Sequence, residues 1–416
     1  MKKNGNMRKC RLFLLLCVLV LSGCQRRQAD LENSNTSSGQ AVSTQSAEGN
    51  EQKEHCTFVP IKEKKLRKNG LETIKGKISE IFYGNDGNLL IQAEKTMYLY
   101  NIEDKEVKAK MKIPGFRRFS VKRLDDGYAM IGEVSKSEKS GEEMSASTGS
   151  FKGKWEIQFM DSSLNIGNKI DLTELLGERG DILDSECIAI TYEGKKIAVA
   201  TEKGIISCDV QNGEKQRLVD LTKKLVIDHL VLDGVEQLAF TRDGKRLVFF
   251  ANALPESASD GEKGVSAWGT VSLDKDEISM ESDKEYYAEE MQVYDNNLIL
   301  PESFEHNRSR ILSVDLESGK KKLIPFSSKS EGKDGVYASS EGKYFATACL
   351  LDHSVRVRVY NMEKGRLLLE HTISDKKDEY FYRIPSIYLV DSEKTCMVAL
   401  GTGMDDLETK VEQFGF

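Results

Sequence analysis

Short runs of alternating apolar and polar residues recur from residue 75 to the end of the chain. The apolar positions are Val, Ile, Leu, Phe and Tyr, and Asp-Gly, Glu-Gly or Asn-rich segments separate the runs. This pattern is typical of antiparallel strands joined by hairpins. The 3.6-residue period of a helix is weak throughout, and the short segment 171–176 is its one exception. We therefore expect an all-β fold.

A first kind of turn precedes a strand in five places. In each, an acidic residue and a glycine come before an apolar run, and the glycine supplies the positive φ that a tight turn needs. The five copies are Asp86-Gly87, Asp126-Gly127, Glu193-Gly194, Asp243-Gly244 and Glu341-Gly342.

A second kind of turn ends a later strand of each unit. It begins with Asp or Asn and continues through polar residues to a Gly or Lys. Clear copies begin at Asn101, Asp209, Asp315 and Asn361, and degenerate copies at Asp161 and Asp274. Because the two kinds follow one another in a fixed order, they mark a repeated structural unit.

The two-turn unit recurs about every 40 to 60 residues and predicts the four-stranded blades of a β-propeller. Seven four-stranded blades fit best, with six or eight as alternatives. Two β-sandwich domains would also give short strands and turns, but the fixed order of the turns favours the propeller. The predicted blades span 79–114, 119–172, 186–221, 234–282, 289–326, 334–373 and 384–416.

Over residues 75–416 the repeated unit resembles that of YVTN- and WD40-like bacterial propellers. In that family each blade has a strand, a turn such as Asp243-Gly244-Lys245, a second strand and a turn such as 209–213. The chain departs from the true WD40 pattern, since it has no Trp-Asp dipeptide and no Gly-His pair. The resemblance implies a propeller fold.

The last predicted blade is short of strands and ends at Phe416. A propeller ring is often closed by a strand from the other terminus, and the stretch Cys56-Thr57-Phe58-Val59-Pro60-Ile61 is the candidate. Closure of this kind would remove two open sheet edges. The alternative is that this stretch is an unpaired linker.

The N-terminus has the pattern of an export signal. Five basic residues and no acidic residue lie within 1–11, and the ten-residue apolar run 12–21 follows. This run is too short to span the hydrocarbon core of a membrane, which needs about 20 apolar residues. We therefore expect residues 1–23 to be a signal peptide.

The end of this segment, Leu21-Ser22-Gly23-Cys24, resembles the lipobox of bacterial lipoproteins. The resemblance implies that a diacylglyceryl thioether forms on Cys24, that the signal is removed and that Cys24 becomes the new N-terminus. Two or three acyl chains give stable anchoring, where a single chain is marginal. Cys24 is thus the predicted lipidation site, and the cell membrane, on its extracytoplasmic face, is the predicted location.

The domain organisation follows from composition. Residues 24–54 are predicted to be the lipidated N-terminus and a flexible tether, because 25–54 contains Ser, Gln, Asn, Glu and Gly and almost no bulky apolar side chain. Such a segment cannot offset the entropy of ordering. Residues 55–416 are predicted to be the propeller domain.

The chain that remains after removal of residues 1–23 is acidic. Without residues 1–23 the chain has 55 basic and 67 acidic residues, a net charge of −12. An acidic surface repels phosphate backbones, so nucleic acid is not an expected partner. We expect a monomer whose partners are the membrane, through Cys24, and a protein or cell-envelope component.

The body keeps an odd number of cysteines, so they cannot all pair, and no CxxC or Cys/His spacing suggests a metal. Buried free thiols are the favoured interpretation, and one disulfide is the alternative. The cysteines concerned are Cys56, Cys187, Cys208, Cys349 and Cys396.

The sequence motifs predict no catalytic, cofactor-binding or metal-binding residue. The segment 264–268 has Trp268 where a GxSxG nucleophile elbow needs its last glycine. Glu289-Glu290 and Asp405-Asp406 are adjacent pairs, whose side chains point to opposite faces of a strand. Asp405-Asp406 lies in a Gly-rich turn, where a cation site is a weakly supported alternative. The histidines are scattered without ligand spacing: His55, His229, His306, His353 and His371.

Two insertions, 135–153 and 254–264, interrupt the second and fourth units. Inserted loops of a propeller lie at its rim or face, so they are either contact surfaces or neutral.

The sequence therefore predicts a membrane-tethered propeller that binds a protein or a cell-envelope glycan through one face, without catalytic activity. The alternative is a propeller enzyme, a hydrolase or lyase acting on sugars, lactones or peptides. The central channel distinguishes them. Clustered carboxylates, a metal or an ordered His/Asp set would favour catalysis, whereas a smooth apolar or mixed channel with a conspicuous exposed aromatic patch would favour binding.

Overall fold

The structure is a computed structural model, and it describes most of the chain after residue 63. The described residues are 64–65, 70–134, 154–176, 182, 184–227, 229–257, 265–275, 277–283, 286–288, 290–303, 310–326, 335–351, 354–374, 385–402 and 408–416. The predicted signal peptide, Cys24, the tether and the insertion 135–153 lie outside them.

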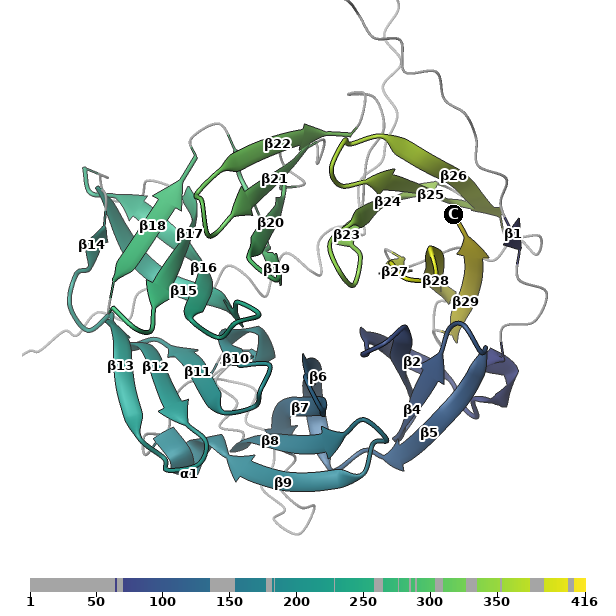
Figure 1. The fold of residues 1–416 in the computed structure, drawn as a ribbon, viewed down its shortest axis with the longest axis horizontal. Coiled ribbons are helices and arrows are strands. Elements are labelled where there is room, and N and C mark those ends of the chain that lie inside the picture. Colours follow the sequence, from purple (N-terminus) through teal and green to yellow (C-terminus); the bar gives the residue numbers. More distant parts are fainter. Residues whose placement is uncertain are drawn as a thin grey trace, which may run out of the picture. The chain divides into compact units, whose positions relative to one another are not determined.

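The described strands form seven antiparallel sheets arranged as the blades of a propeller (Figure 1). Blades 1 to 3 consist of β2 (Ile78–Tyr83), β3 (Asn88–Ala93), β4 (Thr96–Asn101) and β5 (Glu106–Lys112); β6 (Phe116–Leu124), β7 (Gly127–Val134), β8 (Lys154–Asp161) and β9 (Ile166–Asp171); and β10 (Ile188–Ile190), β11 (Lys196–Thr201), β12 (Gly204–Asp209) and β13 (Lys215–Asp220).

The remaining four blades follow in chain order. Blades 4 and 5 consist of β14 (Val226–Ile227), β15 (Leu230–Phe240), β16 (Arg246–Pro255), β17 (Val265–Ser272) and β18 (Ile278–Ser282); and β19 (Gln292–Tyr294), β20 (Asn297–Pro301), β21 (Arg310–Asp315) and β22 (Lys321–Pro325). Blades 6 and 7 consist of β23 (Gly335–Ala338), β24 (Tyr344–Leu351), β25 (Ser354–Asn361) and β26 (Leu367–Ser374); and β27 (Ser386–Val390), β28 (Thr395–Thr402), β29 (Glu408–Gly415) and β1 (Lys64–Lys65).

The predicted count of seven blades is confirmed, and the pair of β-sandwich domains is excluded. Within the described ranges, three short helices lie between strands: η1 (Leu71–Thr73), α1 (Leu172–Leu176) and η2 (Ser185–Cys187). The helix α1 falls in the one segment with helical periodicity, and the Asp171 carboxylate accepts hydrogen bonds from its first backbone N–H groups. Among the described residues, no helix is long and apolar enough to cross a membrane.

The core consists of seven hydrophobic clusters, one between each pair of neighbouring blades. Within β3, for example, Leu89 and Ile91 pack toward blade 7 while Leu90 packs toward blade 2. A central strand is therefore buried on both faces, which is why it is a continuous apolar run instead of an alternating one. Each blade stabilises its two neighbours.

The glycines of the first turn adopt the predicted left-handed conformation, with φ between 67° and 71° at Gly87, Gly194, Gly244 and Gly342. In the second turn, the Asp or Asn side chain accepts hydrogen bonds from backbone N–H groups two to three residues later, as Asp209 does from Gln211 and Asn212. Both kinds of turn lie on one face of the ring, which we call the turn face, because they join the first strand to the second and the third to the fourth. The opposite face, with the connections between the second and third strands and between blades, we call the loop face.

The ring is closed by the N-terminal strand β1, whose Lys64 and Lys65 pair with Gly415 and Phe414 of β29. The prediction that a strand from the N-terminal side closes the ring is thus confirmed. The stretch predicted for it, 56–61, lies outside the described residues. The four-strand rule is wrong for blade 4, where the short strand β14 adds a fifth strand. The insertion predicted at 254–264 also begins too early, because Leu254 and Pro255 continue β16 and pair with β15.

Candidate functional site

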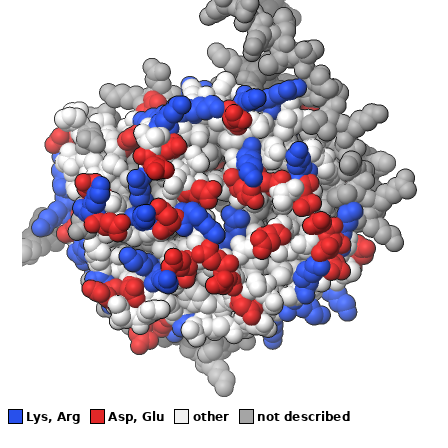
Figure 2. All heavy atoms as spheres, viewed as in Figure 1, with Lys and Arg blue, Asp and Glu red and all other residues white. Residues whose placement is uncertain are grey.

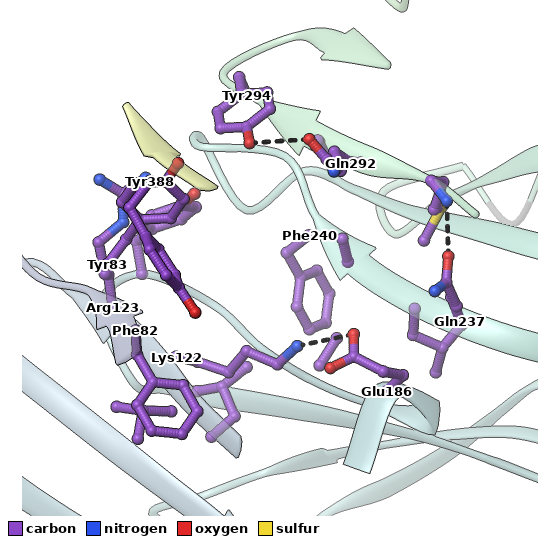
Figure 3. A pocket seen from close by; sticks show the side chains of 18 of the residues that line it. Phe82, Tyr83, Lys122, Arg123, Glu186, Gln237, Phe240, Gln292, Tyr294 and Tyr388 are labelled. Carbon is purple, nitrogen blue, oxygen red and sulfur yellow. Dashed lines mark hydrogen bonds and ion pairs between the residues drawn. The ribbon is translucent and has the colours of Figure 1, made fainter. Parts of the chain in front are cut away.

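The innermost strands of six blades line a cavity of about 360 Å³ in the central channel (Figure 3). Five of these strands are β2, β6, β15, β19 and β27. Blade 3 contributes β10 and a residue that follows it. Aromatic side chains dominate the walls, and polar groups are interspersed among them. The aromatic lining residues are Phe82, Tyr83, Tyr192, Phe240, Tyr294 and Tyr388.

Toward the turn face, two side chains bridge the channel. The Arg123 guanidinium of blade 2 donates a hydrogen bond to the Ser340 carbonyl of blade 6 at 2.9 Å. Blades 2 and 6 are not neighbours in the ring, so this bond crosses the channel. The Tyr83 hydroxyl of blade 1 donates to the Ala338 carbonyl at 2.9 Å and accepts from the Leu389 N–H at 3.0 Å. These bonds narrow the channel at its turn-face end.

Toward the loop face, the cavity adjoins a groove of about 600 Å³ between β2, β6 and η2. The two share Lys122 and Glu186, which form an ion pair at 3.2 Å. Strand β6 is the basic wall of this entrance, because four of its nine residues are cations in an otherwise acidic chain. The cations of β6 are Arg117, Arg118, Lys122 and Arg123.

Two amides on the opposite wall have fixed orientations. The Gln237 Oε1 atom accepts a hydrogen bond from the Met291 N–H at 2.6 Å. The Gln292 Oε1 atom accepts from the Ala338 N–H at 3.3 Å and from the Tyr294 hydroxyl at 3.1 Å. Both bonds to backbone N–H groups join adjacent blades, so these side chains stabilise the ring as well as lining the channel.

The phenols of Tyr83, Tyr294 and Tyr388 are neutral at ordinary pH. Burial raises the pKa of Tyr388 to about 12, and it also raises the pKa of Tyr83 and of Tyr294. Glu186 is the one carboxylate among the lining residues that the structure describes, and Lys122 pairs with it. The channel therefore has a mixed aromatic and polar lining.

Those residues from the sequence motifs that the structure describes are not among the residues that line this cavity. Ser266 of the elbow-like segment is buried in β17, where its hydroxyl accepts from the Ala288 N–H at 3.1 Å. His371 lies in β26 against the Phe414 ring, with centroids 4.7 Å apart. No group of three or more potential metal ligands is present among the described residues. His55, His306, His353, Glu289 and the pair Asp405-Asp406 lie outside those residues.

The predicted buried thiols are confirmed for three cysteines. Cys187, Cys208 and Cys396 are free and buried, while Cys349 is half-buried and Cys56 lies outside the described residues. Burial raises the pKa of Cys187 to about 11, which keeps it a thiol.

Sequence reasoning missed Tyr83, Arg123, Gln237 and Gln292. Their positions in the sequence were informative, because the first strand of each blade must line the channel. Polar or aromatic residues directly before each first turn are therefore candidate channel residues.

The surface shows no large area of one charge on the face in Figure 2, where basic and acidic side chains are interspersed.

Comparisons with known proteins agree with the fold. The chain is similar to the β-propeller domain of Cps50 (Swd1) from Myceliophteria thermophila, with 11% identity, a TM-score of 0.50, and coverage of 82% of this chain and 97% of that one. By structure, the chain is a seven-bladed β-propeller. A chain of a mitotic checkpoint complex is also similar, with 10% identity, a TM-score of 0.44, and coverage of 92% and 100%. No protein-family model and no curated protein matches the sequence.

Proposed function

We propose that this protein is a lipid-anchored, extracytoplasmic binding module, whose WD40-like propeller recognises a protein or cell-envelope partner without catalysing a reaction. The lining of the channel is the observation that carries this proposal. It combines six aromatic side chains with amides and cations, while its one described carboxylate is paired with Lys122. Such a mixed lining suits recognition, because apolar walls supply affinity and a few placed polar groups supply orientation.

The anchoring half of the proposal depends on Cys24. The apolar run 12–21 and the lipobox-like Leu21-Ser22-Gly23-Cys24 support it, since a thiol is the group that takes up the diacylglyceryl chain. Cys24→Ala should release the protein from membranes, and the measurement is the fraction of protein in the membrane pellet. Unchanged membrane association of Cys24→Ala that resists salt washing would contradict anchoring through this residue.

The recognition half is tested by chemical crosslinking in intact cells, followed by capture of the full-length protein and identification of what is attached. We expect a specific partner. Purified full-length protein is tested in parallel for turnover of a panel of sugars, lactones and peptides. Turnover without any crosslinked partner would overturn the proposal in favour of a propeller enzyme.

A further inference from the structure

The walls of the channel include two side-chain amides. Their oxygen atoms already accept hydrogen bonds, which leaves their NH₂ groups as donors. The amide oxygens of Gln237 and Gln292 accept bonds from the backbone N–H groups of Met291 and Ala338. This fixes each amide so that its NH₂ group is directed away from the backbone donor. Within the part of the chain that the structure describes, neither NH₂ group has a hydrogen-bond partner. Both side chains line the cavity (Figure 3).

The same lining has one cation without a matching anion. Lys122 pairs with Glu186, but the one hydrogen-bond partner of the Arg123 guanidinium among the described residues is the neutral carbonyl of Ser340. A guanidinium has five N–H donors, so most of them are unused. The phenols add no negative charge, because burial raises the pKa of Tyr388 and of Tyr294. The lining of this cavity thus has an excess of donors, and Arg123 is its one cation without an ion pair among the described residues; toward the turn face Arg123 also lines a second pocket, with Asp86, Asp295 and Glu341.

The size and walls of the cavity restrict what could meet that charge. A volume of about 360 Å³ is near the lower end of the range for small-ligand pockets, about 300–1,000 Å³. Aromatic side chains, among them Phe82, Phe240 and Tyr388, form its sides. A doubly charged phosphate would leave a negative charge unmatched against these rings, whereas a single carboxylate on an apolar body would match both the charge and the walls.

We propose that the channel binds a carboxylate on a short apolar body, which enters from the loop face. The Arg123 guanidinium receives the carboxylate, and the amide N–H groups of Gln237 and Gln292 are the further donors. This inference deepens the proposed binding function and rests on it. The carboxylate has two sources of the same chemistry: a free organic acid, or a carboxylate of a partner polypeptide.

The test uses the full-length chain in mild detergent and two probe libraries. The first contains all N-acetylated dipeptides, prepared once as free acids and once as C-terminal amides; the second contains end-blocked peptides with one internal Glu or one internal Gln. Retained peptides are identified by mass spectrometry. We expect carboxylates to be retained about tenfold more than their neutral counterparts, which corresponds to about 1.4 kcal/mol of binding free energy. Retention of the first library indicates a free acid or a chain terminus, and retention of the second indicates a side chain.

The decisive variant is Gln237→Glu. The new carboxylate still accepts the Met291 N–H bond, so the contact between blades is kept, but the donor is replaced by a negative charge. The preference for acids should disappear. Gln211→Glu is the matched control, since it adds the same charge at an exposed turn of blade 3 and should leave the preference intact. Arg123→Gln should likewise remove the preference for acids. Thermal unfolding of each variant shows whether the fold is kept.

Equal retention of acids and amides by the unaltered protein would overturn the inference, as would a preference for acids that survives both Gln237→Glu and Arg123→Gln. Failure of the proposed function is a different result. If the purified protein shows no preference for acids while cells yield a crosslinked partner that both variants still capture, the channel inference alone is wrong. If the acids bind but no partner is captured, the proposed partner recognition alone is wrong.

Discussion

The two faces of the ring differ in how they hold the blades together. On the turn face, neighbouring blades are hydrogen-bonded directly, for example from the Ser340 N–H to the Leu389 carbonyl at 2.9 Å and from the Arg242 N–H to the Asp295 carbonyl at 3.3 Å. On the loop face, connections are longer, and several of them, such as 135–153 and 304–309, lie outside the described residues. The turn face therefore stabilises the ring, which leaves the loop face and the channel entrance available for recognition.

The strongest contact of the turn face is the buried Asp391 carboxylate of blade 7. It accepts hydrogen bonds from the hydroxyls of Ser339 and Ser340 at 2.7 and 2.9 Å. It also accepts from the backbone N–H groups of Glu341 and Lys343 at 2.7 and 3.2 Å. One carboxylate thus fixes the whole first turn of blade 6 against blade 7.

The largest expected effect is that of Asp391→Ala. The substitution leaves four donors without this acceptor, two of them the hydroxyls of the buried Ser339 and Ser340, so we expect a loss of about 3–4 kcal/mol in the free energy of unfolding. Denaturant unfolding measures it. Asp209→Ala is the matched control, because Asp209 also accepts two backbone N–H bonds in a turn, but at an exposed site, and about 0.5–1 kcal/mol is expected there. Equal losses in the two variants would contradict the special role of the interblade contact.

A smaller loss in the free energy of unfolding is expected when the pH is raised. Burial raises the pKa of Tyr388 to about 12 in the folded protein, while an unfolded chain has the ordinary value of about 10. The folded state therefore holds this proton where the unfolded state has lost it. Stability is fully present below pH about 10 and falls as the pH rises toward 12, by on the order of 2 kcal/mol.

Denaturant midpoints measured across this pH window test the effect. Tyr388→Phe should make the fall shallower, since the substituted side chain has no proton to lose. A fall of unchanged steepness would show that other groups control the alkaline transition.

Tyr83→Phe should cost about 1–2 kcal/mol, because it removes both bonds that join blade 1 to blades 6 and 7. Thermal unfolding measures the loss. Tyr98→Phe is the control: its hydroxyl makes one long bond of 3.4 Å, to the Lys75 carbonyl, and a loss below about 0.5 kcal/mol is expected. The prediction is wrong if Tyr83→Phe is no more destabilising than Tyr98→Phe.

The smallest expected effect lies on the loop face. The Glu186 side chain is 47% exposed, and its ion pair with Lys122 is near solvent. Glu186→Gln should change the free energy of unfolding by less than about 0.5 kcal/mol. A loss comparable with that of Asp391→Ala would show that the loop face also holds the ring together, and the contrast between the two faces would fail.

Local features of the fold were predictable from the sequence. Turns such as Asp243-Gly244 and 209–213 are set by residues next to one another, and their fixed order gave the blade boundaries to within a few residues, except that blade 4 begins at Val226 instead of 234 and blade 7 also contains β1. The short helix α1 lies in the segment 171–176, which helical periodicity had singled out, and Asp171 caps it locally. Such signals need no information from the rest of the chain.

The channel could not be predicted in this way. Tyr83 meets Ala338 and Leu389 only after the ring closes, across separations of 255 and 306 residues. Arg123 meets Ser340 from a blade that is not its neighbour. No spacing along the chain encodes such contacts, and the added strand β14 likewise depends on its pairing with β15.

Recognition on the loop face is the central claim, and site-specific photo-crosslinking in intact cells tests it most directly. One photoreactive residue replaces Arg118, exposed at the channel entrance on the loop face, and in a matched protein it replaces Glu193, exposed on the turn face. We predict a partner adduct from position 118 and none from position 193. An adduct from position 193 with none from position 118 would contradict the account.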